Sequence, residues 1–171
     1  MPIMRSYNDL NMYYQGGDLK IKLRSLKSLD GSPNHITGNF ICRLNDITSL
    51  VGGPQYVDKN YDCSWNQLTD LDGIPSTIAI LGAFGNNITS LVGIHKIIKS
   101  CERFYFDTNK ITVGGIGLLL ISNLVNIENG AEEEIIDPFK IIINYLGQGT
   151  KGMMECSKEL ISKGYTPYAK L

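Results

Sequence analysis

The chain has 171 residues, and its apolar fraction of 43% is typical of a globular domain that buries a core. Its 16 lysine and arginine residues nearly balance 17 aspartate and glutamate residues, which disfavours a general nucleic-acid binder because such a protein must neutralise many phosphates. No continuous apolar run follows Arg5, and the apolar stretch at 116–125 is too short to cross a bilayer, so we expect a cytoplasmic protein without a membrane partner.

The first 17 residues contain Tyr7, Tyr13 and Tyr14 but show little periodicity. A repetitive region begins directly after them. The outer unit of a stack of repeats has to be covered, because each unit buries its flanks against its neighbours. We therefore expect residues 1–18 to form an N-terminal capping segment.

Residues 19–113 repeat one pattern at a spacing of about twenty residues, which is the signature of stacked repeats. The clearest copies are NFICRLNDITSLVGGP at 39–54 and NYDCSWNQLTDLDGIP at 60–75, and a divergent copy lies at 80–95. Five copies align on one position, which is occupied by Arg24, Asn45, Asn66, Asn86 and Asn109. We expect each copy to supply one coil of the stack.

Apolar residues recur at fixed offsets from this aligned position, and we expect them to point inward. Upstream they alternate with outward residues at period two, which predicts a short strand. These strand pairs are Leu19/Ile21, Phe40/Cys42, Tyr61/Cys63, Leu81/Ala83 and Phe104/Phe106. The downstream places hold Leu26, Ile47, Leu68, Ile88 and Ile111, and then Leu29, Leu50, Leu71 and Leu91. A Gly-x-Pro turn follows in three copies, with Gly93 and His95 in the fourth.

The arrangement Φ-x-Φ-x-x-Asn-x-Φ-x-x-Leu over residues 19–113 resembles the leucine-rich repeat. This resemblance implies a right-handed coil with a parallel sheet on its concave face and a ladder of asparagines inside. A buried carboxamide can bond the backbone groups that a turn leaves unpaired, and the alternative is a set of exposed turn asparagines. The variant Asn-x-Leu-Thr-Ser-Leu-x-Gly-x-Pro resembles repeats in small proteins of tailed bacteriophages, which implies action in the cytoplasm of the infected bacterium.

Residues 114–171 are expected to form a C-terminal helical cap, because no leucine follows Ile111 at the repeat spacing. Helices are predicted over 116–127, from Asp137 to Leu146 and over 151–163. The predicted fold is an α/β solenoid: an irregular leucine-rich-repeat-like stack of about five coils with a short parallel sheet and this cap. Segments 1–18, 19–113 and 114–171 then belong to one structural domain.

Few residues suggest catalysis, and we assign no metal or cofactor. Cys42 and Cys63 occupy the same inward slot and are expected to be reduced fillers rather than disulfide partners. His35 and His95 lie in separate loops without a nearby Cys-x-x-Cys. The segment Gly114–Gly117 is similar to a phosphate cradle but lacks the lysine, and a flexible junction explains its glycines more simply.

The outward strand residues of successive repeats should line up as a docking strip. Tryptophan, tyrosine and arginine dominate interface hot spots, and an exposed aromatic cluster favours a binding role. We expect Trp65, Phe84 and Tyr105 to anchor a protein partner while Arg43 attracts an acidic group. The alternative is that Trp65 leans onto the sheet edge or the cap and that Phe84 covers neighbouring glycines. The predicted protein-binding residues are Lys22, Ile41, Arg43, Leu44, Asp62, Ser64, Trp65, Phe84, Arg103, Tyr105 and Asp107.

The sequence thus favours a non-enzymatic protein interaction module. By the phage resemblance its partner is a host bacterial or viral protein, for example a host defence factor that it blocks. Two alternatives stay open: a nucleotide-binding or enzymatic protein that uses Gly114–Gly117, and a self-assembling structural protein that forms a homo-oligomer.

Overall fold

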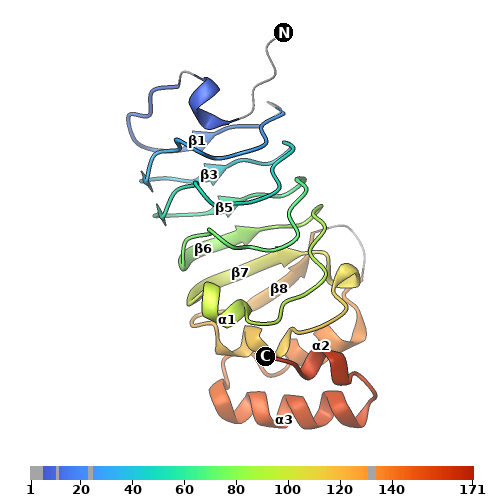
Figure 1. Cartoon of the computed structure of the whole chain (residues 1–171). Helices are drawn as coiled ribbons and strands as arrows, with labels where there is room; N and C mark the ends of the chain where they lie inside the picture. Colours follow the sequence, from blue (N-terminus) through green and yellow to red (C-terminus); the bar gives the residue numbers. More distant parts are fainter. Residues whose placement is uncertain (1–5, 11, 23–24, 131–133) are drawn as a thin grey trace.

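The computed structural model describes residues 6–10, 12–22, 25–130 and 134–171. Within these ranges the chain has a mixed α/β fold with a six-stranded parallel sheet, a two-stranded parallel sheet and three α-helices. The large sheet consists of β1 (Leu19–Lys20), β3 (Phe40–Ile41), β5 (Tyr61–Asp62), β6 (Thr77–Gly82), β7 (Ser100–Phe106) and β8 (Asn126–Asn129). The small sheet consists of β2 (His35–Ile36) and β4 (Tyr56–Val57). Strand order in the large sheet follows the sequence, and the two longer α-helices lie at its C-terminal end (Figure 1).

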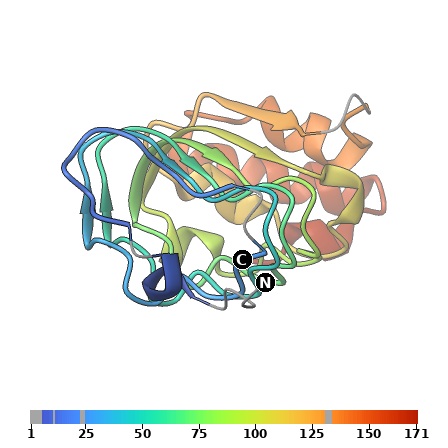
Figure 2. The same cartoon turned by 90° about the horizontal axis from the view of Figure 1, so that it is seen from above.

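Equivalent residues of successive repeats lie side by side in the large sheet. Leu19 pairs with Phe40, Phe40 with Tyr61, Tyr61 with Leu81 and Leu81 with Phe104. In Figure 2 the chain segments that carry β1, β3 and β5 lie over one another. The predicted strand register is therefore confirmed.

The inward positions predicted for the strands and for the segments after them are all buried. Cys42 and Cys63 have no exposed surface and are free thiols, so the prediction that they fill inward slots is confirmed. Beside them, the rings of Phe40 and Tyr61 pack edge to face with 4.9 Å between centroids. Each large apolar side chain buried in this core contributes about 1.5–3 kcal/mol relative to leaving it exposed.

Asn45, Asn66 and Asn86 form the predicted ladder inside the repeats. The Nδ2 atom of Asn66 donates to Cys63 O of its own repeat at 3.0 Å and to Cys42 O of the preceding repeat at 3.1 Å. Its Oδ1 atom accepts the Ile47 N–H of the preceding repeat at 3.1 Å. Asn45 and Asn86 make the same three kinds of bond. The ladder satisfies backbone groups that no strand pairing reaches.

Asn109 is exposed, so the prediction that it continues the ladder is wrong. The chain forms a 3₁₀ helix here, η2 (Thr108–Lys110), which turns Asn109 outward and buries Thr108 completely. The Thr108 N–H donates to Asn129 Oδ1 at 3.2 Å. The equivalent residue of the first repeat, Arg24, lies outside the described residues.

The predicted Gly-x-Pro turns differ from the fourth copy in one respect. Gly31, Gly52 and Gly73 take left-handed φ angles of 88°, 85° and 93°, and each lies two residues before a proline. The fourth copy has His95 in place of the proline, and a single helical turn, α1 (Ile94–Ile97), forms there. A proline disfavours helical backbone in the residue before it, so its absence allows Ile94 to begin a helix.

The prediction of a helix over 116–127 is wrong. The segment forms a short 3₁₀ helix, η3 (Ile116–Leu120), and then enters β8, whose Ile127 pairs with Phe104. Asn123 between them has a left-handed φ of 64°, which no helix accommodates. As a helix, this segment would have apolar residues on all sides. Pairing with the edge of β7 instead makes its last part a strand. The sheet therefore continues one strand beyond the last predicted repeat.

The N-terminal segment contacts the first repeat in the part that the structure describes. A 3₁₀ turn, η1 (Tyr7–Leu10), lies beyond β1 in Figure 1, and Tyr7 is buried. The Asn8 N–H donates to Asp30 O at 3.2 Å. The Tyr14 hydroxyl accepts the Thr37 N–H at 2.9 Å. Two aromatic residues of this segment, Tyr7 and Tyr14, thus lie against the first repeat.

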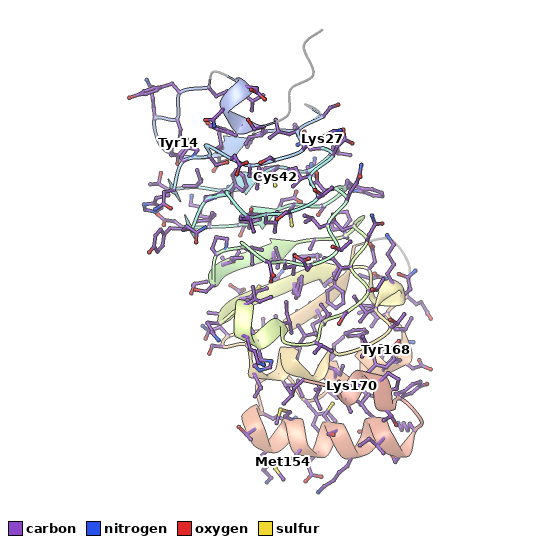
Figure 3. The ribbon with its side chains drawn as sticks, viewed as in Figure 1. Tyr14, Lys27, Cys42, Met154, Tyr168 and Lys170 are labelled. Carbon is purple, nitrogen blue, oxygen red and sulfur yellow. The ribbon has the colours of Figure 1, made fainter. Side chains whose placement is uncertain are left out.

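Two α-helices, α2 (Asp137–Ile143) and α3 (Gly149–Ser162), follow β8, close to the predicted bounds. Phe139 of α2 packs against Phe106 of the sheet with 5.2 Å between ring centroids. The last short helix, η4 (Thr166–Ala169), is held by the Tyr168 hydroxyl, which donates to Ile111 O at 2.8 Å. Met154 lies on the outer side of α3 (Figure 3). Across the described ranges, none of the helices is long and apolar enough to span a membrane.

Candidate functional site

The predicted docking residues lie on the outward face of the large sheet, which we call the sheet face. The strand register aligns one row of this face, formed by Lys20, Ile41, Asp62, Gly82 and Tyr105. The next row, two residues further along each repeat, holds Lys22, Arg43, Ser64, Phe84 and Asp107. Lys22, Leu44, Trp65 and Arg103 are exposed, whereas Ile41, Arg43, Asp62, Phe84, Tyr105 and Asp107 are half-buried and Ser64 is buried.

Trp65, which is exposed, and Phe84, which is half-buried, form an aromatic pair on this face. Their rings meet edge to face with centroids 5.9 Å apart, and 52% of Trp65 is exposed. The indole lies over Gly85, where an added Cβ would come within 2.7 Å of the ring. Phe84 in turn packs closely on Gly130, which has no side chain to obstruct it. Within the described ranges Tyr105 has no ring contact with either residue, so the three predicted aromatic anchors are not one cluster.

Leu44 and Trp65 have left-handed backbone conformations, with φ angles of 58° and 56°. Both directly precede a ladder asparagine, and the same position of the next repeat is Gly85, with φ 69°. A residue with a Cβ atom loses about 1–2 kcal/mol in this conformation, whereas glycine does not. The chain therefore carries two exposed, bulky apolar side chains where glycine would favour folding.

The charges beside this pair are loosely matched. Arg43 Nη1 lies 3.8 Å from Asp62 Oδ2, which is too far for a hydrogen bond. Arg43 Nε is buried and has no hydrogen-bond partner among the described residues. The other carboxylate oxygen of Asp62 accepts the Ser64 N–H at 3.0 Å. The guanidinium is thus neither neutralised closely nor satisfied by hydrogen bonds from the described part of the chain.

The prediction that Ser64 is exposed on the docking strip is wrong, because its side chain has no accessible surface. The neighbouring repeat has Gly82 beside it, and an added Cβ there would lie 3.1 Å from Ser64 Oγ. The missing side chain of Gly82 therefore leaves the space into which the small serine side chain fits. The hydroxyl has no hydrogen-bond partner among the described residues.

Asp107 serves the scaffold rather than the exposed face. Its side chain is only 11% exposed, and its Oδ2 atom lies 3.1 Å from Lys110 Nζ. The same oxygen accepts the Gly85 N–H at 2.8 Å, and Lys110 also donates to Asn86 O at 2.9 Å. Asp107 thus ties the fifth repeat to the fourth, so a direct contact with a partner is disfavoured for it.

The segment Gly114–Gly117 is packed inside the protein. Its glycines are buried, and the Gly114 N–H donates to Pro167 O at 3.0 Å. An added Cβ at Gly115 would lie 3.0 Å from Ile142 of α2. The junction therefore has no space for a phosphate, and η3, the 3₁₀ helix that begins within it at Ile116, is only five residues long.

The remaining candidates for chemistry are metal-binding clusters and the four cysteines. Within the described ranges, no group of three or more histidine, cysteine, aspartate and glutamate residues is placed to hold a metal ion. Burial raises the pKa of Cys101 to about 11 and that of Cys156 to about 12, so neither thiol is a ready nucleophile at neutral pH. Burial raises the pKa values of Cys42 and Cys63 as well.

A surface hollow of about 420 Å³ lies beside α2 and was not anticipated. It is lined by the segment Glu134–Pro138, by Lys140 and by Tyr165 and Tyr168 of the C-terminal segment. Lys140 already pairs with Asp137 at 3.3 Å and with Glu134 at 3.8 Å. The hollow forms between segments that are distant in sequence, so no local pattern could predict it. Similarly, only the fold brings Gly85 against Trp65 and Gly130 against Phe84.

Comparison of the chain with protein-family models, with curated proteins and with solved structures gives no match in any of the three.

Proposed function

We propose that the protein is an irregular leucine-rich-repeat-like solenoid with a C-terminal helical cap, and that it acts as a non-enzymatic protein-binding module. Strands that follow the sequence order in one register and an asparagine ladder across three repeats support the solenoid. A stack of this kind provides a continuous outer surface without requiring a catalytic centre. The partner binds on the sheet face, which a leucine-rich-repeat coil places on its concave side.

One observation carries the binding proposal: Leu44 and Trp65 are exposed, bulky and apolar at left-handed backbone positions. Backbone strain of this kind clusters at functional sites, where something other than stability maintains it. Tryptophan is also among the residue types that dominate interface energetics. The edge-to-face contact with Phe84 gives the indole a defined orientation for a partner.

The biological setting of the proposal comes from the resemblance to phage proteins. The protein acts in the cytoplasm of an infected bacterium and binds a host or viral protein there. Blocking a host defence factor is one activity of this kind. The nearly balanced charge of the whole chain, −1, supports a protein partner over a nucleic acid.

The test is affinity capture from a bacterial lysate with the wild-type chain and with the double variant Trp65→Ala/Tyr105→Ala. The control variant is Tyr56→Ala, which removes a side chain that is 63% exposed on the small sheet. We expect a partner that binds wild type and control but not the double variant. Thermal unfolding of all three proteins separates lost binding from lost folding.

Equal capture of the same proteins by the double variant would refute the role of the sheet face. A large loss of thermal stability would instead place the two aromatic residues in the core. Light scattering at two concentrations tests self-assembly, because a homo-oligomer grows with concentration and a monomer does not. Calorimetric titration with nucleotides tests the enzymatic alternative at Gly114–Gly117, which the packing there does not favour.

A further inference from the structure

Arg43 is an under-satisfied cation of the sheet face. Its guanidinium carries five N–H donors, yet none of them has a hydrogen-bond acceptor among the described residues. Its ion partner Asp62 lies 3.8 Å away, and 42% of the Arg43 side chain is exposed. A guanidinium in this state gains most from a carboxylate that can accept two parallel hydrogen bonds.

A second cation extends this charge toward the N-terminal end of the sheet face. Lys22 occupies the position equivalent to Arg43 in the preceding repeat, is exposed and has no ion pair with any described residue. Lys20, in the other row, is matched by Asp18 at 3.3 Å. Asp62 has an ion pair with Arg43 alone among the described residues, so the row of Lys22 and Arg43 carries one unmatched positive charge.

The apolar surface begins directly beside these cations. Leu44 follows Arg43 in sequence, and 39% of it is exposed. Trp65 occupies the same position in the next repeat, with Phe84 against its edge. The N-terminal half of the sheet face thus offers an apolar surface on one side and two under-matched cations on the other.

We propose that the sheet face recognises an acidic peptide segment of its protein partner, in which a bulky apolar side chain lies near one or more carboxylates. This rests on the proposed function and assigns the chemistry of the partner. The apolar side chain packs on Trp65 and Leu44, and a carboxylate accepts hydrogen bonds from Arg43. A further carboxylate pairs with Lys22, two repeats from Trp65, which corresponds to about 10 Å or about three residues of extended chain.

A peptide fits these observations better than a nucleic acid does. Asp18 and Asp62 lie among the cations and would repel a continuous polyanion, whereas a peptide can place its carboxylates only where cations await them. The exposed leucine also favours an aliphatic or aromatic side chain over a stack of bases.

The test uses the fluorescence of Trp65, the only tryptophan of the chain. Three probe peptides are titrated: Ac-EEGFGEE-NH2, its basic counterpart Ac-KKGFGKK-NH2 and Ac-EEGGGEE-NH2, which lacks the apolar side chain. The variant Arg43→Gln is compared with Lys151→Gln, which removes a charge from exposed α3 instead. Independently of any ligand, quenching of Trp65 by iodide is compared with quenching by caesium.

We expect saturable binding of the acidic phenylalanine peptide and much weaker binding of the other two. Arg43→Gln should weaken binding about ten-fold and Lys151→Gln should not change it. Raising the salt from about 0.05 M to about 0.5 M should also weaken binding. Iodide should quench wild-type Trp65 better than caesium does, and Arg43→Gln should reduce this difference. Circular dichroism of both variants confirms that they are folded.

The proposal is overturned if the basic peptide binds as well as the acidic phenylalanine peptide or if Arg43→Gln has no effect on binding. It is also overturned if a short oligothymidylate, titrated in the same way, binds as tightly as the acidic phenylalanine peptide. Loss of lysate capture in the Trp65/Tyr105 variant without any effect of Arg43→Gln would leave the docking function standing and reject only the acidic partner. Capture that survives the Trp65/Tyr105 variant would reject the docking function itself.

Discussion

Removal of one ladder asparagine should destabilise the protein by an amount that depends on which backbone groups lose their last partner. In Asn66→Ala, the Ile47 N–H loses the Oδ1 acceptor that the ladder gives it. A buried donor left unpaired costs about 1–3 kcal/mol. Cys42 O keeps a bond from Asn45 and Cys63 O keeps one from Asn86, so each lost bond there costs only about 0.5 kcal/mol. The expected loss in the free energy of unfolding is about 2–4 kcal/mol.

Asn109→Ala is the matched control, because Asn109 aligns with the ladder in sequence but is exposed. We expect this control to change the free energy of unfolding by less than about 1 kcal/mol. The assay is urea unfolding followed by far-ultraviolet circular dichroism, with all variants extrapolated to water in the same way.

Double variants test the shared carbonyls directly. Asn45 and Asn66 both donate to Cys42 O, so removing both leaves that carbonyl without either donor. Their joint effect should exceed the sum of the single effects by about 1–3 kcal/mol. Asn45 and Asn86 share no backbone partner among the described residues, and their effects should add within about 0.5 kcal/mol. Equal coupling in both pairs, or equal losses for Asn66→Ala and Asn109→Ala, would refute this account.

Three further outcomes are expected. Gly130→Ala should lower the free energy of unfolding by about 1–3 kcal/mol and shift the fluorescence of Trp65, because the added Cβ would displace Phe84, which packs on Trp65. An unchanged melting temperature and fluorescence spectrum would contradict the contact between Gly130 and Phe84. Leu44→Gly should change the free energy of unfolding in water by less than about 1 kcal/mol, because relief of the strained left-handed φ offsets the lost packing. The control Leu50→Gly, at a fully buried position, should lower the free energy of unfolding several times more. Similar losses for the two variants in urea unfolding would show that Leu44 belongs to the core. The buried thiols should destabilise the fold in alkali, because the unfolded chain loses the thiol protons from about pH 8.5 while folded Cys101, whose pKa burial raises to about 11, keeps its proton. The free energy of unfolding should be constant below about pH 8.5 and should fall above it by about 1.4 kcal/mol per pH unit and thiol. A free energy of unfolding from urea titrations that stays constant from about pH 8.5 to about pH 11 would contradict the burial of these thiols.

The repeat made most of the interior predictable. A residue type that recurs at one offset, such as Cys42 and Cys63, has to satisfy the same environment in each repeat, so several copies test one assignment. The period-two alternation then assigns the inward face of each strand. Both arguments use only the spacing of residues along the chain, and the buried positions of the repeats agree with them.

The errors arise where a neighbouring segment decides the outcome. Alternation places Ser64 outward, but the absent side chain of Gly82 in the next repeat opens a space that buries it. The apolar residues of 116–127 suit a central helix equally well, and the free edge of β7 turns Ile127 into a strand residue. Neither Gly82 nor that edge is adjacent in sequence to the residue whose position it decides.

The scaffold and the candidate binding surface are linked through adjacent residues. Asn45, Asn66 and Asn86 each follow a residue with left-handed φ, which turns the asparagine inward and the preceding side chain outward. Thr108, which precedes Asn109, lacks this conformation, and there Asn109 is exposed while Thr108 is buried. The ladder therefore requires a left-handed residue but not a large one, since Gly85 serves equally well. What the ladder leaves free is the choice of side chain at Leu44 and Trp65, and an exposed apolar choice there is best explained by a bound partner.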